Sequence, residues 1–161
     1  MQITEPVTML TDYALSAANL FFAISTYNSM NSRNRVTGLL LLQGFVAQAV
    51  SGFAGGTFHG FALQLETSTR QLFWNVVVFS VGATLGFLGS AIHAADVQRE
   101  NGKWLVGAVV IAVAGLGVQL TGFRAHRDFN HNDIFHMIQI VAMSMFFRGS
   151  RRLLDRAYSP R

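Results

Sequence analysis

Three of the chain's five histidines, His126, His131 and His136, lie within eleven residues of one another. Two carboxylates, Asp128 and Asp133, lie in the same segment, which leads directly into an apolar stretch. Imidazole and carboxylate side chains are common metal ligands and common groups for proton transfer. Their concentration at the start of an apolar segment predicts a chemical site near the end of a helix.

The composition is typical of a membrane protein. Charged residues make up 12% of the chain and hydrophobic residues 51%, whereas soluble domains usually contain about 25% charged residues. The chain has no cysteine, which excludes a disulfide framework, a thiolate metal site and a thiol nucleophile. The net charge of +4 arises from basic residues between and after apolar segments. It therefore indicates membrane topology, and we expect no nucleic-acid partner.

Five apolar segments are long enough to cross a bilayer, which requires about 20 mostly apolar residues. These segments cover residues 6–27, 36–59, 71–94, 104–123 and 132–147. Short polar connections join them, and nothing resembles a domain linker or a repeat. We therefore predict an all-α integral membrane protein with one domain over residues 1–161. Its fold is a compact bundle of about five transmembrane helices, followed by a basic tail at 148–161.

The distribution of Lys and Arg predicts the orientation of this bundle. With five spans, nine of the twelve basic residues fall on the side of the C-terminal tail and three on the other side. Because cytoplasmic connections carry the excess of Lys and Arg, we expect the N-terminus outside and the C-terminus in the cytoplasm of a bacterial inner membrane. All histidines except His93 then lie at the outer face, together with the polar start of the first helix.

The first predicted helix has a polar face formed by Glu5, Thr8, Asp12 and Asn19, which follow one another at steps of three, four and seven residues. An ionised side chain within a span is costly unless it is paired, hydrated or bound to a cation. Two interpretations of Asp12 follow. It caps a neighbouring helix in the wet interface, or it faces the bundle interior as a metal ligand or general base.

The second and fifth helices carry further candidates. Ser51, Gly55 and His59 follow one another at four-residue steps, so that a face of small residues leads to an imidazole. Such a face lets helices approach closely without any ligand, and His59 is equally explained as an interfacial residue bonded to a carbonyl. Asp133 and His136 are neighbours at i and i+3 on the fifth helix, where Asp133 is expected to orient the His136 ring.

These segments resemble the CREST-type membrane hydrolase superfamily of alkaline ceramidases and progestin/adiponectin-receptor-type proteins. The resemblance covers Glu5–Asn19, Ser51–Gly60 and His131–Gln139. In that superfamily three histidines and an aspartate surround a zinc ion inside a helical bundle, near a serine. Two positions of this chain depart from its motifs. Gly55 stands in place of the serine of Ser-x3-His, and Asn132 stands in place of the first histidine of His-x3-His.

The resemblance implies a zinc-dependent hydrolase that acts on a lipid or an amphiphilic amide or ester near the outer leaflet. The implied Zn²⁺ ligands are His59, His131, His136 and Asp12. The metal would lower the pKa of its bound water toward about 7, with Asp12 as the alternative general base. Ser51 or Asn19 would bind the developing oxyanion. Glu5, Asn19 and Asp133 would support the ligands.

Two other classes of protein remain open. His59 and His136 lie at similar depth on different helices, as the two axial ligands of a haem b require. The glycine-rich helix faces and the fourteen phenylalanines suit a non-catalytic subunit that packs against membrane lipids, against copies of itself or within a larger membrane complex.

Overall fold

The structure, a computed structural model, describes residues 3–32, 34–94, 99–123, 125–126 and 129–156. Five α-helices make up most of this part of the chain, and its only β-structure is an isolated bridge between His126 and Phe129. The helices are α1 (Pro6–Asn28), α2 (Arg35–Phe61), α3 (Thr67–Ala94), α4 (Arg99–Thr121) and α5 (His131–Arg156). The prediction of an all-α fold with five long helices is confirmed.

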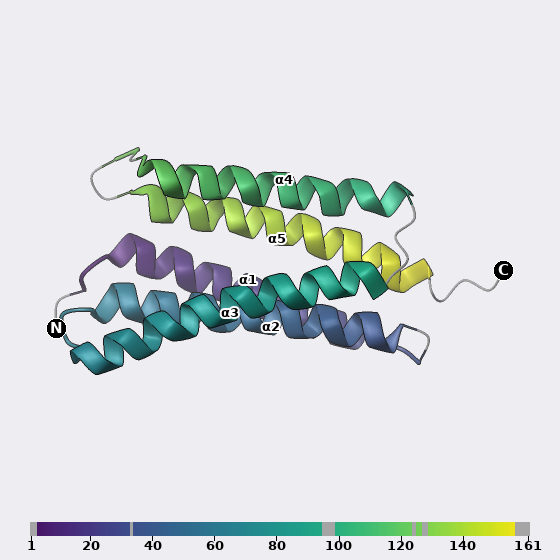
Figure 1. The fold of residues 1–161 in the computed structure, drawn as a ribbon, viewed down its shortest axis with the longest axis horizontal. Coiled ribbons are helices and arrows are strands. Elements are labelled where there is room, and N and C mark those ends of the chain that lie inside the picture. Colours follow the sequence, from purple (N-terminus) through teal and green to yellow (C-terminus); the bar gives the residue numbers. More distant parts are fainter. Residues whose placement is uncertain (1–2, 33, 95–98, 124, 127–128, 157–161) are drawn as a thin grey trace.

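The helices form a group of three and a group of two, as Figure 1 shows. α1 packs against α2 and α2 against α3, while α4 packs against α5. The two groups meet mainly between α1 and α5; within the described residues, α3 packs against neither α4 nor α5. The chain runs up and down, so the starts of α1, α3 and α5 lie at one end of the bundle with the ends of α2 and α4 (Figure 1).

Apolar side chains fill the opposite end of the bundle. The core there includes Phe22, Phe45, Leu88 and Phe146. Phe22 also stacks on Phe147, with ring centroids 4.7 Å apart. This core fixes α5 against α1 and α2 because aromatic pairs bury large areas and prefer defined geometries. The ionisable side chains that are buried in the bundle, Asp12, Asp133 and His136, lie toward the other end.

Glycines set the close approach of α1 and α2. A Cβ atom at Gly52 would stand 2.8 Å from the carbonyl oxygen of Asp12 and 2.9 Å from the amide nitrogen of Ser16. Both are backbone atoms, so a side chain at this position would push the helices apart. The small-residue face of α2 therefore packs against α1, which is the role that such faces have in membrane bundles.

Four helices are long and apolar enough to cross a membrane: α1, α2, α3 and the Lys103–Thr121 part of α4. Large apolar side chains remain exposed along α3 and α4, among them Phe79, Leu85, Val113 and Leu120. Helices that are apolar on nearly all sides are typical of a lipid environment. The coarse prediction of a membrane-spanning bundle is therefore supported for four of the five helices.

The helix bounds differ from the predicted spans by more than two residues in three places. α3 begins at Thr67 rather than at residue 71, α4 begins at Arg99 rather than at residue 104, and α5 continues to Arg156 through most of the predicted tail. Apolar segments mark only the part of a helix that suits lipid, whereas the helix itself continues into polar residues. The tail residues 157–161 lie outside the described residues.

Candidate functional site

A cavity of about 680 Å³ lies between the two helix groups, and all five helices line it. Pockets of about 300–1,000 Å³ are the size that holds small organic ligands. The polar side chains in its wall include Asp12, Gln48, Ser51, His59, Arg70, Gln119, Asn132, His136 and Gln139. Its apolar side chains include Phe58, Trp74, Val77, Val81 and Phe135. Polar side chains thus reach the cavity from all five helices, and α3 adds the apolar Trp74, Val77 and Val81 beyond its polar first turn.

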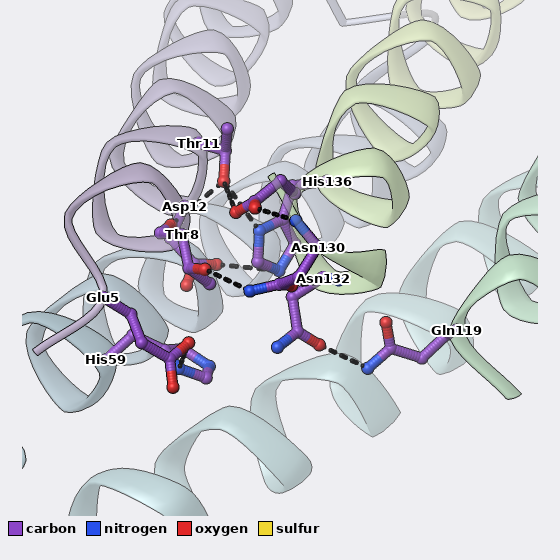
Figure 2. A network of polar contacts seen from close by, with 10 residues as sticks. Glu5, Thr8, Thr11, Asp12, His59, Gln119, Asn130, Asn132 and His136 are labelled. Carbon is purple, nitrogen blue, oxygen red and sulfur yellow. Dashed lines mark hydrogen bonds and ion pairs between the residues drawn. The ribbon is translucent and has the colours of Figure 1, made fainter. Parts of the chain in front are cut away.

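The closest pair of ionisable groups in the cavity wall joins α1 to α5. His136 Nε2 lies 3.2 Å from Asp12 Oδ1, as Figure 2 shows. Both side chains are buried, with 4% of Asp12 and 8% of His136 exposed. The second carboxyl oxygen, Asp12 Oδ2, is buried and has no hydrogen-bond partner among the described residues. A buried polar atom of this kind needs a partner, and a ligand or water in the cavity can supply it.

Thr11 contacts Nδ1, the other ring nitrogen of His136. Its Oγ1 lies 3.1 Å from His136 Nδ1 and donates a hydrogen bond of 3.0 Å to the carbonyl of Thr8. A hydroxyl group has one proton. When Thr11 donates that proton to Thr8, it must accept a hydrogen bond from His136 Nδ1–H. One further proton then lies between His136 Nε2 and Asp12 Oδ1, and the buried pair is neutral as a whole.

The N-terminus of α5 fixes the position of His136. Asn130 Oδ1 accepts a hydrogen bond of 2.8 Å from the amide of Asn132, and Asp133 Oδ2 accepts one of 2.7 Å from the amide of Asn130. This reciprocal arrangement is a capping box, which satisfies amide groups at the start of a helix. Asn130 Nδ2 also donates to Thr8 Oγ1 at 3.4 Å, which ties the cap to α1 (Figure 2).

A second imidazole–carboxylate pair lies nearby, between α2 and the start of α1. His59 Nδ1 lies 3.1 Å from Glu5 Oε2, and both residues appear in Figure 2. Two backbone hydrogen bonds support this pair, from the amide of Glu5 to the carbonyl of His59 and from the amide of Thr4 to the carbonyl of Gly60. The end of α2 is thereby fixed to the start of α1.

The structure brings four predicted site residues to one cavity: Asp12, Ser51, His59 and His136. The other two metal and oxyanion candidates are not part of its lining. His131 is the first residue of α5 and is half-buried. Asn19 is fully buried deeper in α1, where its Nδ2 donates to the carbonyl of Leu15 at 2.9 Å. Asn19 therefore does not face this cavity, and its role as oxyanion donor stays a prediction.

The predicted partner of the His136 ring is corrected. Asp133 is fully buried, but its Oδ2 accepts from the backbone of Asn130. Its Oδ1 reaches only Thr11, at 3.5 Å. The groups in contact with the His136 ring are Thr11 and Asp12. Asp133 therefore contacts Asn130 and Thr11, and Thr11 in turn contacts the His136 ring.

The predicted zinc ligands do not converge as a set. Two ligands of a tetrahedral zinc ion stand about 3.3 Å apart, so His136 Nε2 and Asp12 Oδ1 at 3.2 Å would suit two ligand positions. Within the described residues, however, no group of three or more His, Asp or Glu side chains is placed to hold a metal ion. His59 is directed to Glu5. These residues do not fit a zinc site with three protein ligands.

The haem b alternative meets a different obstacle. An axial histidine needs one ring nitrogen free to bind the iron. Both ring nitrogens of His136 already have partners, Thr11 at Nδ1 and Asp12 at Nε2. The bis-histidine assignment of His59 and His136 therefore finds no support in the arrangement of the His136 ring.

Several site residues were missed by sequence reasoning. Thr11 lies next to Asp12 in the sequence and off the predicted polar face. Gln119 and Asn132 join α4 to α5 by a hydrogen bond of 2.7 Å. Arg70 was assigned to a connection, although it lies in the first turn of α3. A signal for it exists in the sequence, because Arg70, Trp74, Val77 and Val81 are spaced along one helical face.

The fold and the site define a helical bundle with four helices able to span a membrane and a polar cavity between its helices. The chain belongs to a family of unknown function, DUF6962, whose family model matches residues 7–101 and 83–155. No curated protein and no solved structure matches the chain. The resemblance to the CREST-type superfamily stays a prediction.

Proposed function

We propose that this protein is an integral membrane hydrolase that cleaves an ester or amide bond of an amphiphile held in the cavity. The observation that carries the proposal is the buried contact of 3.2 Å between His136 Nε2 and Asp12 Oδ1 in the wall of a cavity of ligand size. A carboxylate and an imidazole that share a proton can accept and return protons in a hydrolytic reaction.

The residues suggest how the proton moves. A water molecule attacks the carbonyl carbon of the bound ester or amide. Asp12 Oδ2, which lacks a partner among the described residues, accepts a proton from that water while the shared proton moves onto His136 Nε2. The pair then returns one proton to the leaving alcohol or amine as the carbon–oxygen or carbon–nitrogen bond breaks. Thr11 keeps the imidazole in place at Nδ1.

In this proposal, the hydroxyl group of Ser51 donates a hydrogen bond to the oxyanion that develops on the substrate. Ser51 is buried in the cavity wall on α2, one helical turn from Gly55. A single donor of this kind contributes about 10²–10³ to the rate of hydrolysis in enzymes where it has been removed. The oxyanion role is assigned to Ser51 alone, since Asn19 lies outside the cavity lining.

The proposal includes the placement of the bundle in the membrane. α5 packs along α4 and contacts α1, so we propose that it crosses the bilayer with them despite its polar first turn. The excess of Lys and Arg at the end where α5 terminates then places that end in the cytoplasm and the cavity near the outer leaflet.

The test uses purified protein in lipid nanodiscs prepared from a total membrane lipid extract. Mass spectrometry follows the release of fatty acids, alcohols and amines over time. We expect release by the wild type and a loss of about 10²-fold or more in the Asp12→Asn and His136→Gln variants. Glu66→Gln is the matched control, because Glu66 is an exposed carboxylate outside the cavity lining. Equal release by the wild type and Asp12→Asn would contradict the proposal.

A further inference from the structure

Arg70 is a charged cavity residue that the proposed reaction does not use. It lies in the first turn of α3, is half-buried and lines the cavity. One guanidinium nitrogen donates to Thr67 Oγ1 at 3.3 Å. Its Nε is buried without a hydrogen-bond partner among the described residues. The Nε–H group thus has no acceptor in the part of the chain that the structure describes.

No carboxylate of the described residues pairs with Arg70. Asp12 is paired with His136, and Glu5 is paired with His59. A cation within a membrane bundle is normally paired with an anion or with several acceptors. An anionic group of a ligand would supply the missing partner, and the planar guanidinium suits carboxylate and phosphate in particular.

The face of α3 that lines the cavity has a polar and an apolar part. Thr67, Arg70 and Gln71 form its first turn, and Trp74, Val77 and Val81 follow further along the helix. The N-terminal end of a helix also favours an anion through its free amide groups. One face of a single helix therefore presents a cation at one end and an apolar strip beyond it.

The cavity wall reaches the surface of the bundle on α3. Trp74, which lines the cavity, is 47% exposed. The apolar chain of a bound molecule can therefore extend past Trp74 toward the surrounding lipid.

We infer that the cavity takes an amphiphile with a carboxylate or phosphate group, which binds Arg70, and an apolar chain, which lies along Trp74, Val77 and Val81. The inference rests on the proposed function in one respect, since it names the substrate class of the same cavity. The anionic group and the apolar chain are both required for recognition.

Trp74 provides the reporter for the test. The chain has two tryptophans, and the other, Trp104, lies on α4 beneath Arg148, whose guanidinium carbon is 4.9 Å from the ring centroid. Trp104→Phe leaves Trp74 as the single tryptophan. The protein is placed in phosphatidylcholine nanodiscs and titrated with a fatty acid brominated along its chain, and separately with the brominated alcohol of the same chain length. Bromine quenches tryptophan fluorescence on contact.

The fatty acid is expected to quench Trp74 saturably, at a concentration about tenfold lower than the alcohol, which is the factor that a charge-assisted hydrogen bond provides. In Arg70→Gln this difference disappears, and in Arg70→Lys part of it remains. Arg151→Gln is the matched control, because it removes an exposed arginine far along α5 and should keep the full difference. Circular dichroism and gel filtration confirm that each variant is folded.

Three results would overturn the inference. The first is equal quenching by acid and alcohol in the Trp104→Phe protein. The second is a preference for the acid that persists in Arg70→Gln. The third is displacement of the brominated acid by inorganic phosphate or acetate at the same concentration as by an unlabelled fatty acid, which would indicate a site for a free anion. If the protein hydrolyses lipid but binds the acid and the alcohol equally well, this inference fails and the proposed function stands. If it prefers the acid but releases no product in the hydrolysis assay, the proposed function fails and this inference stands.

Discussion

Gly55 on α2 lies directly against the carboxyl group of Asp12 on α1. A Cβ atom at Gly55 would stand 3.0 Å from each of the two carboxyl oxygens of Asp12 and 3.1 Å from its carboxyl carbon. Glycine at this position therefore leaves room for the acid in the place where it meets His136. Gly55, which stands where the CREST-type motif has a serine, therefore has a packing role in this protein.

Gly55→Ala should displace the Asp12 carboxyl group by a few tenths of an ångström and weaken its contact with His136. We expect a loss of about 1–3 kcal/mol in unfolding free energy and a fall in hydrolysis of at least tenfold. Gly82→Ala is the control, because a Cβ atom there meets nothing within 4 Å. Activity in Gly55→Ala equal to that in Gly82→Ala would show that the exact place of the carboxyl group is unimportant.

Thr11→Val should reduce turnover while leaving substrate binding largely unchanged. The substitution removes the hydroxyl group that contacts His136 Nδ1, so the imidazole loses the partner that fixes its orientation. We expect kcat to fall by about 10–100-fold with KM within about threefold, whereas Thr11→Ser should restore most of kcat. Steady-state kinetics of the three proteins checks this. A change confined to KM would indicate that Thr11 serves binding alone.

The main features of the fold follow from the sequence because they depend on the length and polarity of each helical segment. Five long apolar segments gave five helices, and the alternating direction of the chain brought the polar ends of α1, α2 and α5 together. Asp12, His59, Ser51 and His136 reach one cavity for this reason. The N-terminal extension of α3 was missed, and Arg70 with it, because a count of apolar residues begins only after the polar first turn.

The partners of individual side chains depend on how the helices rotate against one another. Thr11 contacts His136 where α1 packs against α5, and the rotation of one helix against another is not visible in the residue spacing of either helix. Asp133 was expected to contact His136, since the two are neighbours on α5. A carboxylate at the third position of a helix is also close to free backbone amides, and in this structure the amide of Asn130 is its partner.

Metal and haem content provide a separate check. Within the described residues, no group of three or more candidate ligands is placed around a metal site, so we expect zinc well below one ion per chain in the purified protein. Elemental analysis of the wild type and His136→Ala tests this. One zinc per chain in the wild type, lost in His136→Ala and His59→Ala, would support the zinc-dependent mechanism instead. Strong visible absorption of the same sample would indicate haem b.

The orientation in the membrane can be tested with single cysteines, because the chain has none of its own. Ser68 lies in the first turn of α3, and Ser32 lies in the connection between α1 and α2; both are exposed. A thiol reagent that does not cross membranes should label Ser68→Cys in intact cells and label Ser32→Cys only after lysis. The reverse pattern would place the cavity at the cytoplasmic face and contradict the proposed topology.

The most direct test of the central proposal is a double-mutant cycle on the contact between Asp12 and His136. Groups that act as one unit lose nearly all their effect when either is removed. Rates of product release in nanodiscs are measured for the wild type, Asp12→Asn, His136→Gln and the double variant. We predict that the double variant is no slower than either single variant. Losses that multiply in the double variant, or a single variant with full activity, would contradict a shared proton between these two residues as the basis of the reaction.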